Sequence, residues 1–217
     1  QCAFKMLPSI FISKIILNNF RSHENFSIDA NSSNVVLFGK NGVGKTNILE
    51  SISLLSPGRG LRNAKNEEII NKKSGINYSL SADLILNDSS VKIKKFFVKD
   101  NSNKSNLLID DEKSKTSELL NFLRVIWVTP VMEKIMLQSN SERRNFFDRL
   151  IFNIEKKHLK SFSAYNKFTK ERLHILKSNN IDDGWLQQIE TNIAQHAYEV
   201  IRYRKEAIDK INANLSL

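Results

Sequence analysis

Alternating apolar residues predict β-strands in the first half of the chain. Residues 9–20 carry apolar side chains at spaced positions, and residues 24–28 can return beside them as a second strand. Residues 76–99 show the alternation again on both sides of the turn sequence Asn87-Asp88-Ser89. Two strands joined by such a turn predict a β-hairpin.

Two short apolar runs, residues 34–38 and 123–128, do not alternate. Such runs predict strands that are buried on both faces, as in a parallel sheet. Residues 46–55 then predict a helix, which the sequence Pro57-Gly58 ends. The polar stretch 100–106 predicts a loop.

The second half of the chain predicts helices only, because neither glycine nor proline occurs between Ser141 and Asp183. The periodicity predicts helices over 141–152 and 155–177. One long helix follows over 185–213, with either Val200 or Ile201 on its apolar face.

These elements predict an α/β chain in two parts. Residues 9–138 are expected to form a phosphate-binding lobe with a partial sheet. Residues 139–217 are expected to form a helical lobe with a long antiparallel helix pair.

The candidate chemistry lies between the first buried run and the first helix. The segment matches the phosphate-loop pattern G-x-x-x-x-G-K-T as Gly39-Lys40-Asn41-Gly42-Val43-Gly44-Lys45-Thr46. Its glycines let the backbone curl so that successive N–H groups point into one concavity, and the helix dipole adds positive potential. We expect Lys45 to reach the β- and γ-phosphates and the Thr46 hydroxyl to ligate Mg²⁺.

The charge of the chain suggests a polyanionic partner. The 217 residues carry a net charge of +10, although a Lys-, Asn- and Ile-rich composition typical of an AT-rich genome explains the same excess. One cysteine, Cys2, excludes a disulfide framework within the chain and fits a reducing, cytoplasmic location. No apolar run approaches the ~18 residues of a membrane span.

A stripe of lysines on the predicted helix 155–177 is the candidate DNA-binding surface. At about 100° per residue five lysines share one narrow face, with apolar residues on the others. These are Lys156, Lys160, Lys167, Lys170 and Lys177. The stripe suits contacts with DNA phosphates, and a solvated helix face explains it almost equally well.

Four further features have structural interpretations. Residues 107–112 resemble an acidic Mg²⁺ motif, but the apolar run is short and predicts a turn in an exposed hairpin. Residues 55–59 resemble the signature motif of ATP-binding cassettes, but they follow the phosphate loop too soon and predict a helix terminus. Arg143 and Arg144 begin a helix and either bind an anionic partner or pair with Glu142 or Asp148. No metal-ligand spacing relates the histidines, His23, His158, His174 and His196.

Several motifs together resemble one family. The loop form G-x-N-G-x-G-K-T resembles ATP-binding-cassette and SMC-type heads, and residues 16–23 (ILNNFRSH) resemble the opening shared by RecF and SMC-type repair ATPases. Residues 56–62 (SPGRGLR), 125–132 (VIWVTPVM) and 141–150 (SERRNFFDRL) resemble RecF of the proteobacterial kind. The resemblance covers nearly everything from about residue 10 to 217.

The resemblance to the RecF family implies a cytoplasmic protein of DNA repair, recombination and replication restart, within the SOS response. It implies ATP and Mg²⁺ as cofactors, weak ATPase activity, and ATP-dependent homodimerisation on DNA at gaps or junctions. Other Rec recombination-mediator proteins are the implied partners. By the same resemblance Arg21 and Ser22 approach the nucleotide, although a capped strand end explains them equally well.

The chain departs from that family in length. RecF proteins are longer, and their signature motif, acidic Mg²⁺ motif and catalytic Glu lie in a C-terminal portion, so no catalytic residue is assigned here. We expect an apparently truncated chain with half of its sheet absent, poorly stable and nearly inactive as an ATPase. The alternatives are an SMC-type or ABC-type head of other function and an inactive RecF fragment.

Overall fold

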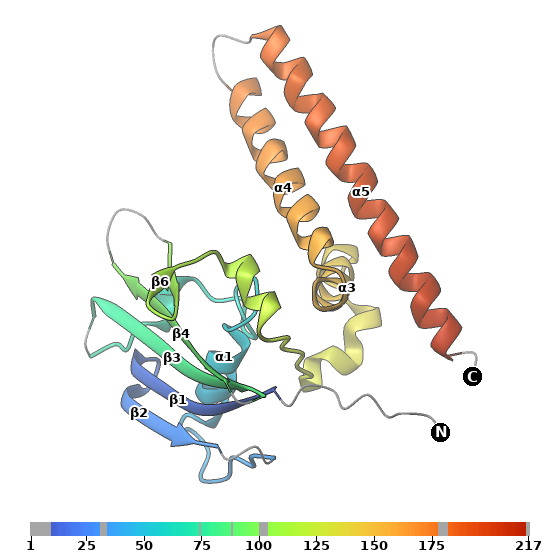
Figure 1. The fold of residues 1–217 in the computed structure, drawn as a ribbon. Helices are drawn as coiled ribbons and strands as arrows, with labels where there is room; N and C mark the ends of the chain where they lie inside the picture. Colours follow the sequence, from blue (N-terminus) through green and yellow to red (C-terminus); the bar gives the residue numbers. More distant parts are fainter. Residues whose placement is uncertain are drawn as a thin grey trace. The chain divides into compact units, whose positions relative to one another are not determined.

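A computed structural model describes most of the chain as two units, the first ending at Trp127 and the second beginning at Val128 (Figure 1). The described residues are 10–30, 34–73, 75–87, 89–99, 104–177 and 182–215. We expected a boundary after residue 138. The 3₁₀ segment η2 (Pro130–Leu137) instead contacts the first long helix of the second unit, and it therefore groups with that unit.

A six-stranded antiparallel sheet forms the first unit, in the order β2-β1-β3-β4-β5-β6. Its strands are β1 (Ile10–Phe20), β2 (His23–Asp29), β3 (Asn77–Leu86), β4 (Ser89–Val98), β5 (Asn106–Ile109) and β6 (Glu112–Lys113). This confirms the strands predicted in 9–20 and 24–28 and the hairpin predicted in 76–99. Asp88 of the predicted turn, and residues 100–103 of the predicted loop, lie outside the described residues.

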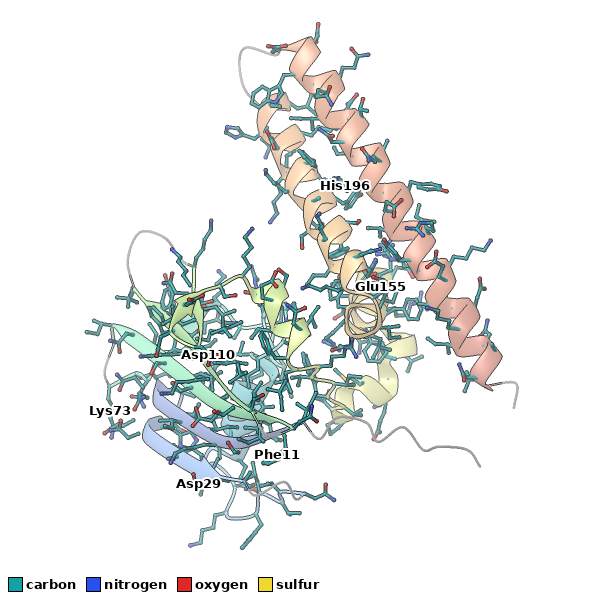
Figure 2. All side chains as sticks on the ribbon, in the orientation of Figure 1. Phe11, Asp29, Lys73, Asp110, Glu155 and His196 are labelled. Atoms are coloured by element: carbon teal, nitrogen blue, oxygen red, sulfur yellow. The ribbon has the colours of Figure 1, made fainter. Side chains whose placement is uncertain are left out.

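The turn of a hairpin predicted at residues 107–112 is also confirmed, and the turn is exposed, although Leu107 before it is buried in the core. Asp110 and Asp111 form its turn with positive φ values of 49° and 64°, and Asp110 lies between the two short strands (Figure 2). The Asp110 carboxylate accepts a hydrogen bond from the backbone N–H of Lys92 at 2.8 Å. An aspartate fits this turn because its short polar side chain tolerates the left-handed conformation.

One face of the sheet carries the core, because alternate residues of a strand point to the same side. Leu17, Leu80, Leu84 and Phe97 are fully buried there. Helix α1 (Lys45–Ser53) follows the phosphate loop and delivers Leu54 and Leu55 to this core. Because α1 ends at Ser53, residues 55–59 follow the helix terminus, as expected.

Two short elements, the helix α2 (Asn66–Ile69) and the 3₁₀ helix η1 (Thr116–Asn121), add to the first unit. The stretch after α2 is fixed to the end of β1 by backbone bonds. Arg21 N–H donates to the Ile69 carbonyl at 2.7 Å, and Asn71 N–H donates to the Asn19 carbonyl at 2.8 Å. These bonds place the β1–β2 turn beside the segment that contains α2.

The two strands predicted at 34–38 and 123–128 are wrong for this structure. Both segments are irregular, and Val36, Phe38 and Val128 expose 80%, 91% and 82% of their surface. A parallel strand forms only where a neighbour pairs with its backbone groups. Among the described residues no strand pairs with either segment. Val36, Phe38 and Val128 face solvent, whereas Leu123 and Val125 pack partly against the core of the first unit.

The second unit is helical, as predicted. It contains α3 (Asn140–Ile154), α4 (Lys156–Leu176) and α5 (Asp183–Leu215), and α4 and α5 pack side by side along their lengths (Figure 1). Ser139 begins α3 with a reciprocal capping box to Glu142. Of the two residues left open for the apolar face of α5, Val200 is buried and Ile201 is exposed.

A buried charged cluster joins these helices. The Asp148 carboxylate of α3 is 2.6 Å and 2.8 Å from the guanidinium of Arg204 on α5, and 3.0 Å from Nε2 of His158 on α4. Burial raises the pKa of Asp148, but the hydrogen bonds from His158 and Arg204 hold it below its ordinary value. Asp148 therefore pairs with His158 and Arg204, and not with Arg144 as one interpretation of the sequence predicted.

Candidate nucleotide-binding site

The phosphate loop adopts the curled backbone that its glycines predict. Gly39, Gly42 and Gly44 have φ values of 145°, 87° and 98°, a region that other residues rarely occupy. The loop leads directly into α1, whose first residue is Lys45. The predicted loop and helix are therefore both present, whereas residues 34–38 before the loop do not form the predicted strand.

Gly44 is the most constrained of these glycines. A Cβ atom at this position would lie 2.5 Å from Nε2 of His23 and 2.7 Å from Oγ of Ser22. Real Cβ contacts do not come so close, so Gly44 lets the β1–β2 turn approach the start of α1. His23 Nε2 also lies 3.3 Å from the Gly44 carbonyl oxygen.

The start of α1 is suited to an anion. Gly44 is its N-cap and provides no side chain to accept a hydrogen bond from the first turn, where the positive end of the helix dipole lies. Lys45 Nζ curls over the loop and donates to the carbonyls of Gly39 at 2.7 Å and Lys40 at 2.8 Å. Thr46 is exposed in the first turn. The residues therefore fit a nucleotide phosphate and its Mg²⁺.

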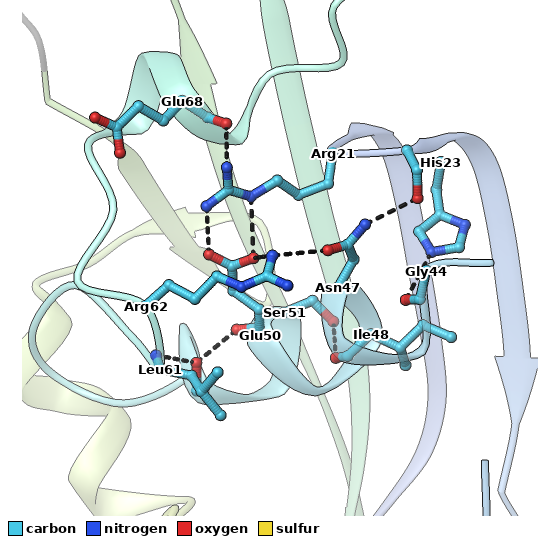
Figure 3. Close-up of polar contacts among 12 residues, drawn as sticks. Arg21, His23, Gly44, Asn47, Ile48, Glu50, Ser51, Leu61, Arg62 and Glu68 are labelled. Carbon is cyan, nitrogen blue, oxygen red and sulfur yellow. Dashed lines mark hydrogen bonds and ion pairs between the residues drawn. The ribbon is translucent and has the colours of Figure 1, made fainter. Parts of the chain in front are cut away.

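A buried glutamate organises the charged groups beside the loop. Glu50 of α1 is fully buried, and its carboxylate is 2.6 Å and 3.0 Å from the Arg21 guanidinium and 2.9 Å from that of Arg62. Figure 3 shows the two arginines reaching this carboxylate from different segments. Arg21 also donates to the carbonyl of Glu68.

Asn47 connects this cluster to the β1–β2 turn. Its amide nitrogen donates to Ser22 Oγ at 2.8 Å, and its oxygen accepts from Arg62 at 2.8 Å (Figure 3). The structure thus places Arg21 and Ser22 beside the first turns of α1, next to the phosphate loop. Glu50, Arg62 and Asn47 were not identified from the sequence, because their partners lie far away along the chain.

All five lysines of the predicted DNA-binding stripe are exposed. Four lie on α4 and the fifth is its C-cap: Lys156, Lys160, Lys167, Lys170 and Lys177. Arg172, a further basic residue of α4, instead forms an ion pair with Glu190 of α5 at 2.7 Å. The stripe therefore lies on the side of α4 that does not pack against α5.

Neither a metal site nor a membrane-spanning helix is found in the part of the chain that the structure describes. No cluster of three or more His, Cys, Asp or Glu residues converges as a metal site there. No helix in that part is long and apolar enough to cross a membrane.

Comparisons with known proteins agree on one family. Residues 11–132 match the family described as "RecF/RecN/SMC N terminal domain". The "DNA replication and repair protein RecF" of Rickettsia akari is 34% identical over 212 residues, 94% of this chain and 58% of that protein. Its counterpart in Rickettsia bellii (strain OSU 85-389) is 33% identical over 215 residues, with the same coverage.

A solved structure shares the fold. "Structure of the recombination mediator protein RecF-ATP in RecFOR pathway" matches with a TM-score of 0.81 and 24% identity over 95% of this chain and 56% of that one. The likeness confirms the predicted fold class, a P-loop ATPase head with a helical lobe. The chain spans 58% of the length of these two curated relatives.

Proposed function

The chain belongs to the RecF/RecN/SMC N-terminal domain family, and we propose that it is the ATP-binding portion of a RecF-type DNA repair protein. The observation that carries the proposal is the phosphate loop, with three positive-φ glycines and an uncapped helix start. These groups bind ATP phosphates, and the exposed Thr46 hydroxyl ligates Mg²⁺. Arg21 and Ser22 form the edge of the nucleotide site.

The same proposal extends to DNA. The lysine stripe of α4 contacts backbone phosphates at gaps or junctions, and ATP favours a homodimer closed on DNA. Other Rec mediator proteins are the partners, and the setting is cytoplasmic DNA repair, replication restart and the SOS response. Support for these steps comes from the relatives named above and from the exposed lysines.

Replacing Lys45 with alanine is expected to weaken binding of fluorescent ATP with Mg²⁺ by about 10- to 100-fold. The reason is the loss of charged hydrogen bonds to phosphate, each worth about 1.5–3 kcal/mol. A fluorescence titration measures this. Lys99→Ala, which removes an exposed lysine elsewhere in the first unit, is the control and should bind like the parent. Equal affinities for the parent and Lys45→Ala would contradict the proposed site.

Reversing the charge at Lys160 and Lys167 is expected to weaken DNA binding and to flatten its salt dependence. Each lost phosphate contact lowers the slope of log K against log salt by roughly 0.7 to 0.9. Fluorescence anisotropy at several salt concentrations measures both quantities. Lys205→Glu and Lys210→Glu on α5 provide the charge-matched control, since both lysines are exposed. An unchanged slope in the α4 variant would remove the stripe from the proposal.

A further inference from the structure

A cavity lies at the opposite end of α1 from the phosphate loop. Its volume is about 380 Å³, and it is bounded by the end of α1, the segment around α2, and β4. Its apolar wall includes Leu54 and Ile69. The polar and charged residues that line it are Arg59, Lys65, Asn66, Glu67, Lys95 and Ser105.

A buried lysine forms part of this cavity. The alternation of β4 places Lys95 between Ile93 and Phe97 on the face that carries the core, and only 5% of Lys95 is exposed. Lysine is rarely buried to this extent without a partner. Its Nζ donates to the carbonyl oxygen of Leu54 at 3.0 Å, at the end of α1, where the helix dipole favours a cation.

That bond uses one of the three N–H donors of the ammonium group. Among the described residues no carboxylate pairs with Lys95, so its charge is buried with donors still available. Leaving such a group unsatisfied costs free energy, whereas an anion in the cavity would satisfy it.

Two exposed cations line the same cavity. Arg59 and Lys65 form no ion pair with a carboxylate in the described part of the chain, and Glu67 is the one acidic side chain of the lining. The cavity thus has an excess of positive charge at its rim as well as in its interior. Arg59 belongs to the motif of residues 56–62, of which the nucleotide site uses Arg62 and not Arg59.

We propose that this cavity is a second anion site, which binds a phosphate group between Lys95, Arg59 and Lys65. A tetrahedral oxyanion accepts from the free donors of Lys95 and from the guanidinium of Arg59. The phosphate group belongs either to a small phosphorylated molecule or to a DNA backbone. The site is separate from the phosphate loop, and α1 connects the two.

Binding at this site depends on pH in a defined direction. Burial lowers the pKa of Lys95 to about 8. An anion favours the charged ammonium, so affinity is expected to fall by up to tenfold per pH unit as pH rises above about 8. Arg59, Lys65 and Glu67 are the other charged groups that line the cavity. A variant without the Lys95 ammonium shows how much of the pH dependence comes from Lys95 and how much from these three groups.

The test is a titration with sulfate, which stays fully ionised from pH 7 to 9.5, at constant ionic strength. The amide resonances of Gly58 and Ser105 report on this cavity, and those of Gly42 and Gly44 report on the phosphate loop. We expect saturable shifts at Gly58 and Ser105. Lys95→Met should weaken binding at least about tenfold and abolish its pH dependence, whereas Lys94→Met, the exposed neighbour, should change neither.

Absence of saturable shifts, or equal binding by Lys95→Met, would overturn the proposal. Arg59→Gln should also weaken sulfate binding. Because Arg59 is exposed, this variant tests the site without the effect on folding that replacement of the buried Lys95 can have. Inorganic phosphate and a short DNA duplex then identify the source. A backbone site responds to the duplex at lower concentrations than to phosphate, and a small-molecule site responds to phosphate alone. If neither phosphate nor the duplex shifts the resonances of Gly58 and Ser105, the proposal is wrong.

Discussion

Replacing Asp148 with alanine is expected to lower the free energy of unfolding of the helical unit by about 3–5 kcal/mol. Asp148 is buried, and its carboxylate joins α3 to His158 of α4 and Arg204 of α5. Removing one partner of a buried ion pair leaves the other charge uncompensated, which costs free energy of this order. Arg204 is partly exposed, so solvent screening places the effect near the lower end.

Hydrogen exchange measures this effect locally. Peptides from α3, α4 and α5 should exchange faster in Asp148→Ala, whereas peptides from the sheet should not change. Asp209→Ala removes an exposed carboxylate from α5 and is the control for loss of negative charge. The double variant Asp148→Ala, Arg204→Ala should lose less stability than the sum of the losses of the two single variants, because each single variant already removes the same Asp148–Arg204 interaction. Additive losses would show that the pair is not coupled.

The same carboxylate makes stability depend on pH. The pKa of Asp148 is lower in the folded protein than the roughly 3.9 of an unfolded aspartate. Asp148 therefore binds a proton more readily in the unfolded chain. The contribution of its ionised carboxylate to the free energy of unfolding is complete above about pH 5 and is lost as pH falls through 3.9 and below. Urea unfolding from pH 7 to 3 should show this loss in the parent and a smaller loss in Asp148→Asn.

Sequence patterns predicted the elements whose partners lie close along the chain. The β3–β4 hairpin and the three long helices follow from local alternation and periodicity, and the phosphate loop follows from its glycines. The same reasoning failed at residues 34–38 and 123–128. Apolar composition predicts a buried strand, but a strand also needs a neighbour that pairs with its backbone, and no described strand pairs with either segment.

The surroundings of the site were less predictable than its loop. Glu50 meets Arg21 and Arg62 across 29 and 12 residues, and no periodicity relates such positions. Lys95 lies within a basic run of β4, where the sequence does not indicate which lysine is buried. The registers of β4 and β3 decide that, because they set Lys95 opposite Leu80 on the face of the core.

Replacing Glu50 with glutamine is expected to destabilise the first unit by about 3 kcal/mol and to weaken ATP binding. The change keeps the shape of the side chain but leaves two guanidinium groups beside a buried amide. Like charges without a counterion repel, so Arg21 and Arg62 should separate and release the β1–β2 turn from α1. Thermal unfolding and a fluorescent-ATP titration measure the two effects.

Glu112→Gln, an exposed carboxylate in β6, is the matched control and should leave both quantities near those of the parent. Combining Glu50→Gln with Arg21→Gln tests the mechanism, because the double variant also removes one of the unpaired cations. We expect it to be less destabilised than the sum of the single variants by about 1 kcal/mol or more. Losses that add within about 0.5 kcal/mol would contradict a shared ion pair.

The two measurements also separate a structural role from one in the nucleotide site. If Glu50 acts through stability alone, ATP binding should recover once the folded population is restored at low temperature. If Glu50 positions Arg21 and the Asn47–Ser22 contact beside the phosphate loop, affinity should stay low in the fully folded variant. We expect the second result, because the carboxylate that holds Arg21 belongs to the same helix whose N-terminus faces the phosphates.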